Sequence, residues 1–287
     1  MLSQLIFSGI VIGLFYALVA YGLTIIIKTS KNWHFAFGAV FTLGGFIFST
    51  GFERVGLPIW ASVVLSIVVT TIVGVAMEYL IYRLLRQRGV EETVTFVASL
   101  SLFGFSTSSL GLVFGTSPRF VNIEGLNTPL INTGMITVGK WDLIVVILSV
   151  LMAGLMMLLM NKTKLGVLVR AVSDNPRHAQ IMGVNLDRMY ILSYLLGSVA
   201  VGIPAILFAI HNQLDPNAGL EVYLLAAIVV ILGGAGDLRG ALLGGLSVGI
   251  LQKVAVWKLP NEWSMFTTFA VLFIIIIVKP KGLFGRN

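Results

Sequence analysis

The chain has 287 residues, of which 57% are hydrophobic and 11% are charged, and its mean hydropathy is +0.98. Soluble domains carry about 25% charged residues, so this composition excludes a water-soluble protein. The formal net charge is +7, and the absence of cysteine excludes disulfides and cysteine metal sites.

Apolar segments follow one another along the whole chain. A hydrocarbon core of roughly 30 Å requires about 20 apolar residues for each helical span. The segments cover residues 5–27, 35–52, 58–84, 93–115, 141–160, 189–211, 220–236, 239–257 and 263–278. We therefore predict an all-α fold, a polytopic transmembrane helical bundle of about eight to ten spans or re-entrant segments, in a single domain over residues 1–287. The segments 35–52, 220–236 and 263–278 are short for a span, so one or two of them are candidates for broken or re-entrant helices.

Basic residues are distributed unevenly along this alternation. Lys and Arg near span ends are retained on the cytoplasmic side of a membrane. With nine crossings and an external N-terminus, one side collects fourteen of them: Lys28, Lys31, Arg83, Arg86, Arg88, Lys162, Lys164, Arg170, Arg177, Arg188, Arg239, Lys279, Lys281 and Arg286. The other side collects four, namely Arg54, Arg119, Lys140 and Lys258. We predict a cytoplasmic C-terminus, and retention of positive charge explains the net charge without a nucleic-acid partner.

Hydroxyl groups are concentrated in the segment 93–115. They belong to Ser99, Ser101, Ser106, Thr107, Ser108 and Ser109. A polar solute that crosses lipid needs replacement hydrogen bonds, so we predict that these side chains line a pore, together with Phe35 and Phe37. The alternatives stay open, because Ser and Thr in spans also bond to carbonyls of their own helix or serve helix packing.

The ionisable residues and the one P-loop-like pattern argue against ion coupling, nucleotide binding and catalysis by this chain. Glu78 is the only clear acid within a span, and nothing resembles the proton relay of an ion-coupled carrier. The three histidines, His34, His178 and His211, fall in separate loops or span ends. Residues 134–140, "GMITVGK", have the spacing of a nucleotide P-loop, but Trp141 stands where Ser or Thr must hold magnesium, and we expect no strand before it. We therefore predict no catalytic site, no metal and no cofactor.

One long polar stretch, "SDNPRHAQIMGVNLDR" at 173–188, interrupts the apolar pattern. Asn175 suits an N-cap, Pro176 suits the first helical position, and Gly183 suits the left-handed residue that ends a helix. We expect a cytoplasmic helix of about two turns, followed by Asn185 as the cap of the next span. Such a helix is either a connector or a rigid docking element, and its geometry alone leaves both open.

Glycines at helical spacing occur near the C-terminus. Gly236, Gly240 and Gly244 follow one another at i+4, a spacing that lets helix backbones approach closely. We predict helix packing for these residues. Gly236 also lies in "GGAGDLR", which is typical of a turn between two spans.

Several motifs together resemble a known family. They are "GLFYALVAYGLTII" near the start, "ASLSLFG" at 98–104, "FGTSPRF" at 114–120, "KLGVLVRAV" at 164–172, "RAVSDNPRHAQIMGVNLDR" ending at 188, "LGGAGDLRGALLGGL" at 232–246 and "KPKGLFG" at 279–285. In this order they strongly resemble the permease subunits of branched-chain amino-acid ABC importers. The resemblance implies the importer permease fold and a multi-pass protein of a bacterial-type plasma (inner) membrane.

The resemblance also implies partners and a coupling site. The partners would be a second permease, homologous or identical, two cytoplasmic ATPase subunits that hydrolyse ATP, an external or periplasmic solute-binding protein, and the lipid bilayer. The family's coupling loop corresponds to about residues 161–188, which we call the coupling loop. The residues expected to contact the ATPase are Asn175, Pro176, Arg177, His178, Ala179 and Gly183.

One motif departs from the family. The family usually has Asn-Phe-Ala-His-Gly at the start of its second apolar segment, whereas this chain has His34, Phe35, Ala36, Phe37 and Gly38. If these positions shape the pore, the solute is an amino acid or a related small polar solute rather than necessarily an aliphatic amino acid. Two other classes of function remain as alternatives, a stand-alone secondary transporter or channel and a non-transporting membrane scaffold.

Overall fold

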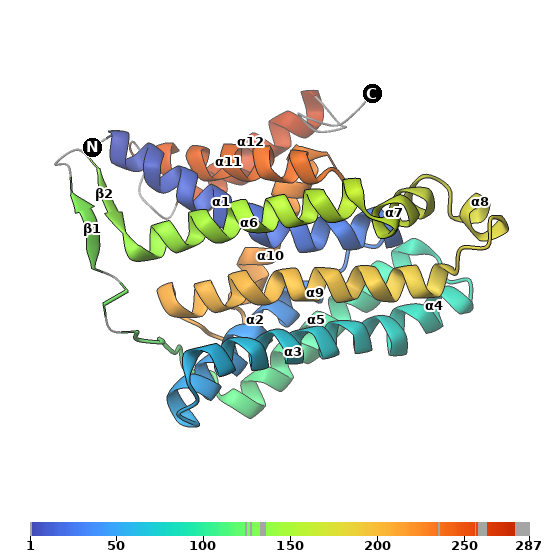
Figure 1. Cartoon of the computed structure of the whole chain (residues 1–287), viewed down its shortest axis with the longest axis horizontal. Coiled ribbons are helices and arrows are strands. Elements are labelled where there is room, and N and C mark those ends of the chain that lie inside the picture. Colours follow the sequence, from blue (N-terminus) through green and yellow to red (C-terminus); the bar gives the residue numbers. More distant parts are fainter. Residues whose placement is uncertain are drawn as a thin grey trace. The chain divides into compact units, whose positions relative to one another are not determined.

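The computed structural model describes residues 2–123, 125–126, 128–132, 136–234, 236–255, 257 and 263–278. Within these residues the chain is helical apart from one antiparallel hairpin, β1 (Pro129–Asn132) with β2 (Thr137–Gly139) (Figure 1). The expectation that no strand precedes residues 134–140 is therefore wrong. β2 covers residues 137–139 of the sequence that has P-loop spacing, and these pair with β1 as an extended hairpin strand.

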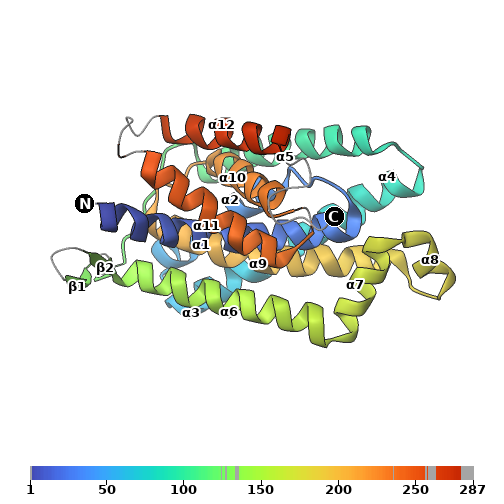
Figure 2. The same ribbon diagram turned by 90° about the horizontal axis from the view of Figure 1, so that it is seen from above.

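The helices follow the predicted apolar segments. They are α1 (Leu2–Ser30), α2 (Phe37–Ser49), α3 (Ile59–Met77), α4 (Arg83–Gln87), α5 (Glu92–Phe114), α6 (Lys140–Lys162), α7 (Lys164–Asp174), α8 (Pro176–Ile181), α9 (Leu186–His211), α10 (Ala218–Gly233), α11 (Leu238–Ala255) and α12 (Trp263–Val278). The described part of the chain also contains two π-helical turns, η1 (Thr50–Arg54) after α2 and η2 (Glu78–Tyr82) between α3 and α4. Figure 2 shows the short helices α7 and α8, which follow α6 and precede α9 in the chain.

Five helices in the described part of the chain are long and apolar enough to cross a membrane: α1, the continuous stretch Ile59–Gln87, α5, α6 and α9. Helices α10 and α11 make a sixth if the pair, bent by 118°, is one broken span. The prediction of a polytopic helical membrane protein is confirmed. Helices α2 and α12, with 13 and 16 residues, match two of the segments that are short for a span. The alternation over nine crossings, which gave the orientation, stays a prediction.

The chain divides into two compact units. The first consists of Met1–Thr24, Ile123–Met156 and Leu224–Asn287, and the second of Ile25–Asn122 and Met157–Tyr223. The second unit contains the whole coupling loop, residues 161–188. It also contains the motifs at 98–104 and 114–120 that resemble the family. The candidate site described below lies entirely within this second unit.

In the first unit, small residues let helices approach closely. A Cβ on Gly9 would lie 2.8 Å from Cα of Ile250, and one on Gly244 would lie 2.6 Å from the carbonyl oxygen of Val229. Gly240 is packed against the backbone of Gly233. Gly236 lies in the turn before α11, as its place in "GGAGDLR" indicated, with φ of +94°, a conformation that glycine adopts without strain, and its packing role stays a prediction.

In the second unit, α2, α3 and α9 form the core. A Cβ on Gly44 of α2 would lie 2.9 Å from Cγ2 of Thr70 and 3.0 Å from Cβ of Ala205. The hydroxyl of Ser66 donates a hydrogen bond of 2.7 Å to the carbonyl of Gly44. These contacts pack α2, α3 and α9 closely against one another.

Candidate functional site

Helix α8 begins with the predicted cap. Oδ1 of Asn175 accepts a hydrogen bond of 3.0 Å from the backbone N–H of His178, and Pro176 occupies the first turn. Asn175 has φ of −153° and ψ of 98°, the extended conformation of an N-cap residue. Fewer backbone N–H groups of the first turn therefore lack a partner, since the Asn175 side chain binds one of them and Pro176 has no N–H.

Helix α8 ends in a Schellman motif. Gly183 has φ of +86°, its N–H donates to the carbonyl of Gln180 at 3.0 Å, and the N–H of Val184 donates to the carbonyl of Ala179 at 3.0 Å. The left-handed conformation predicted for Gly183 is confirmed. Only Met182, Gly183 and Val184 separate α8 from Asn185, whose Oδ1 accepts a hydrogen bond of 3.0 Å from the N–H of Arg188 and caps α9. The link between the two helices is therefore short and fixed by hydrogen bonds.

The surface of α8 differs from the expectation at one residue. Ala179, predicted to lie against the ATPase, is only 4% exposed and is buried within its own chain. Ile181 and Met182 are instead 79% and 84% exposed, and Arg177 and His178 are exposed as well. The sequence contains the signal for this, because residue 181 lies about 200° around the helix from residue 179 and so faces away from it.

The coupling loop is firmly mounted on its unit. Thr163 caps α7 by accepting a hydrogen bond of 3.3 Å from the N–H of Gly166, and the guanidinium of Arg170 donates to the carbonyl of Met160. Val169 and Val172 of α7 are completely buried. Helices α7 and α8 both pack against α9.

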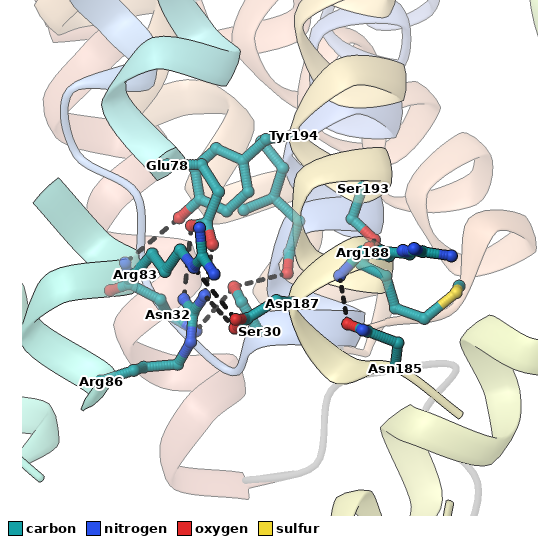
Figure 3. Close-up of polar contacts among 12 residues, drawn as sticks. Ser30, Asn32, Glu78, Arg83, Arg86, Asn185, Asp187, Arg188, Ser193 and Tyr194 are labelled. Atoms are coloured by element: carbon teal, nitrogen blue, oxygen red, sulfur yellow. Dashed lines mark hydrogen bonds and ion pairs between the residues drawn. The ribbon is translucent and has the colours of Figure 1, made fainter. Parts of the chain in front are cut away.

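A cluster of charged side chains joins the start of α9 to the end of the Ile59–Gln87 helix, as Figure 3 shows. We call Glu78, Arg83, Arg86 and Asp187 the Asp187 cluster. Nε of Arg83 lies 3.0 Å from Oδ2 of Asp187, and Nη2 of Arg86 lies 3.9 Å from Oδ1 of Asp187. Both carboxylate oxygens of Glu78 accept hydrogen bonds from Arg86, one of them at 3.3 Å. Cζ of Arg86 also lies 4.1 Å from the ring centroid of Tyr190.

The π-helical turn η2 explains why Glu78 and Arg86 meet. In a regular α-helix, residues eight apart are turned by about 80° beyond two full turns. In η2 the N–H of Arg83 bonds to the carbonyl of Glu78, five residues back, so the turn contains one extra residue. Residues 78 and 86 therefore lie nearly one above the other, as residues seven apart do in a regular helix. Sequence reasoning identified Glu78 as an acid within a span but missed this pairing.

Tyr82, in the same π-helical turn, belongs to a second set of polar contacts, with Ser99 and His34. Its hydroxyl donates to Oγ of Ser99 at 2.8 Å and lies 2.8 Å from Nδ1 of His34. Oγ of Ser99 also accepts hydrogen bonds from the N–H groups of Phe35 at 2.6 Å and Ala36 at 3.3 Å, just before α2. Burial lowers the pKa of His34 to about 3, so this imidazole is neutral at physiological pH.

The residues predicted to line a pore are found in different settings. Ser99 and Phe37 are buried inside the unit, and the ring of Phe35 packs against Phe103 and Tyr223. The hydroxyls of Ser101 and Ser109 donate to carbonyls of their own helix, at 3.0 Å to Val97 and 2.8 Å to Phe105.

Thr107 and Ser108 instead line a cavity of about 680 Å³ with Thr116 and Asp215. This cavity lies at the C-terminal part of α5, and Ser106 on the turn before it is half-buried. Pore lining by this run of residues stays a prediction.

The chain matches a family of known proteins. The family model described as "Branched-chain amino acid transport system / permease component" matches residues 5–276. The chain is 24% identical to the high-affinity branched-chain amino acid transport system permease protein BraD of Pseudomonas aeruginosa, over 99% of this chain and 96% of that protein. It is also 24% identical to the high-affinity branched-chain amino acid transport system permease protein LivH of Escherichia coli, over 99% of this chain and 95% of that protein.

A solved structure has a similar fold. The structure of PsaBC from Streptococcus pneumoniae in complex with Fab matches with a TM-score of 0.52 and 12% identity, over 97% of this chain and 91% of that chain. This likeness concerns the fold alone, and it agrees with the predicted importer permease fold. The family match over residues 5–276 confirms the resemblance drawn from the sequence motifs, and the chain belongs to the family of permease components of branched-chain amino acid transport systems.

Proposed function

We propose that this chain is the permease subunit of an ATP-driven ABC importer and forms half of a translocation pore beside a second permease, homologous or identical. Two cytoplasmic ATPase subunits bind the coupling loops, and an external or periplasmic binding protein delivers the solute. The observation that carries the proposal is helix α8, a two-turn helix capped at both ends by Asn175 and Gly183, in a chain of this permease family.

The exposed side chains of α8 support its role as a docking element. Ile181 and Met182 project an apolar surface at the C-terminal end of α8, and Arg177 and His178 project polar groups. Burial of apolar side chains at an interface is favourable, so the pair is suited to a pocket on another subunit. When the ATPases close on ATP, they move α8 as a rigid body because its two ends are fixed by hydrogen bonds.

The solute follows from the relatives and from the departure at residues 34–38. The similar permeases BraD and LivH are named for branched-chain amino acids, and we propose amino acids or related small polar solutes for this chain. His34 and Phe37, which replace the family's usual Asn and His, are buried within their own unit. Their effect on solute choice is therefore indirect, through the shape of the start of α2.

Copurification tests the proposed function. The full chain, expressed from its native operon with an affinity tag, is expected to copurify with an ATPase subunit and a second permease, and the reconstituted complex should accumulate solute only with ATP and the binding protein. Accumulation by this chain alone would favour a secondary transporter or channel. A purified complex without an ATPase would favour a membrane scaffold.

The predicted orientation has a separate test. The chain has no native cysteine, so single cysteines report accessibility directly. We expect Thr128→Cys, in the proposed external loop, to react with a membrane-impermeant maleimide in intact cells, and Met182→Cys, on α8, to react only after the cells are opened. Both side chains are exposed. Labelling of Met182→Cys from outside would contradict a cytoplasmic coupling loop. The C-terminus itself, with Lys279, Lys281 and Arg286, lies outside the described residues.

A further inference from the structure

We propose that Asp187, held by Arg83 and Arg86, is a positioning residue that passes the displacement of α8 to the Ile59–Gln87 helix. The inference rests on the proposed function, because it requires that an ATPase moves α8. It assigns the step after docking, from the coupling loop to the membrane-spanning part, to one named contact within the second unit.

On the α9 side of this contact, the link between α8 and Asp187 is short and held by hydrogen bonds. Asp187 is the second residue of α9, and only four residues, 182–185, lie between the end of α8 and the start of α9. The two Schellman hydrogen bonds and the hydrogen bond from Arg188 to Asn185 hold this link in one conformation. A displacement of α8 therefore moves the Asp187 carboxylate rather than being absorbed by a loop.

The receiving side is anchored in the interior of the unit. Arg86 is held by both oxygens of Glu78, whose side chain is completely buried, and it lies over the ring of Tyr190. Arg83 in turn lies over the ring of Tyr79, with Cζ 5.1 Å from the centroid. Because both guanidinium groups are fixed by other contacts, a shift of Asp187 pulls the helix that carries them.

The contact itself contributes little to stability. The side chains of Arg83 and Asp187 are 30% and 36% exposed, and partly exposed ion pairs are weak because water screens them. Yet the pair joins the first turn of α9 to Arg83, the residue directly after the π-helical turn η2, whose Tyr82 bonds to Ser99 of α5 and lies 2.8 Å from His34 before α2. A contact that is weak for folding but joins α9 to the Ile59–Gln87 helix is suited to positioning.

The experiment measures solute uptake per ATP hydrolysed. The complete complex is reconstituted in liposomes with the loaded binding protein, and the ratio of uptake to hydrolysis is compared between variants. Asp187→Asn and Arg83→Gln are each expected to lower this ratio by about fivefold or more, the lower end of typical coupling effects. The double variant should be no worse than either single variant, because both substitutions remove the same contact.

Matched controls separate transmission from a general loss of charge. Arg88→Gln makes the same change as Arg83→Gln on an exposed side chain two residues beyond Arg86, and it should keep the wild-type ratio. Asp187→Glu retains the charge and should also retain most of the ratio. A merely structural role would lower the yield of complex and leave uptake per ATP unchanged.

Three outcomes would overturn the inference: a wild-type ratio in Asp187→Asn, an equal loss in Arg88→Gln, or effects of Asp187→Asn and Arg83→Gln that simply multiply in the double variant. Failure of the proposed function looks different. In that case the wild-type preparation contains no ATPase and shows no ATP-driven uptake, before any variant is compared.

Discussion

Gly183→Val is expected to abolish ATP-driven uptake while the chain still inserts in the membrane. At φ of +86° a side chain with a Cβ is strained by about 1–2 kcal/mol, and β-branching adds to this. A Cβ at this position would meet nothing within 4 Å, so the strain comes from the backbone and not from a collision. A two-turn helix has little stability of its own with which to hold the motif. The orientation of α8 relative to α9 would therefore change.

The same position offers its own controls. Asn tolerates the left-handed conformation better than other non-glycine residues, so Gly183→Asn should keep most of the uptake, and Gly183→Ala should fall between Asn and Val. Uptake and the amount of inserted chain are measured in the same membranes. If Gly183→Val inserts normally and transports at the wild-type rate, the coupling loop is only a connector.

Arg86→Met is expected to be the most destabilising single substitution in the Asp187 cluster. It leaves the fully buried carboxylate of Glu78 without its partner, and breaking a buried ion pair in this way costs about 3–5 kcal/mol. The measurement is the fraction of purified chain that stays folded after heating, followed by size-exclusion chromatography in detergent.

The double variant Glu78→Leu with Arg86→Met should recover most of the lost stability, since replacing both ions by apolar groups is often neutral. Arg88→Met, on the exposed neighbouring position, serves as the control and should behave as the wild type. Equal heat resistance of Arg86→Met and Arg88→Met would contradict the pairing of Arg86 with Glu78.

The sequence predicted features that depend on near neighbours. The caps at Asn175 and Asn185 and the left-handed Gly183 follow from hydrogen bonds that span three to five residues, and the structure contains all three. The long helices follow from the number of consecutive apolar residues, which local composition determines. Their existence could therefore be predicted without knowledge of the tertiary structure.

Contacts between distant residues could not be predicted in this way. The contact of Arg83 with Asp187 joins positions 104 residues apart, and it depends on the register of two packed helices. The pairing of Glu78 with Arg86 depends on a π-helical turn that no sequence pattern announced. Ser99 illustrates the same limit, because a hydroxyl in a span is equally compatible with a pore and with the buried hydrogen bonds that it makes to Phe35 and Tyr82.

The extra residue in η2 also affects how this chain can be aligned with others. A relative with one residue fewer between positions 78 and 82 would have a regular α-helix there, and the residues after it would keep the same faces although each is shifted by one position in the sequence. Such a relative must be aligned with a gap inside the helix, although gaps are normally placed in loops. An ungapped alignment would pair Arg83 and Arg86 with residues on another face, so the Asp187 cluster would look unshared even where its geometry is the same.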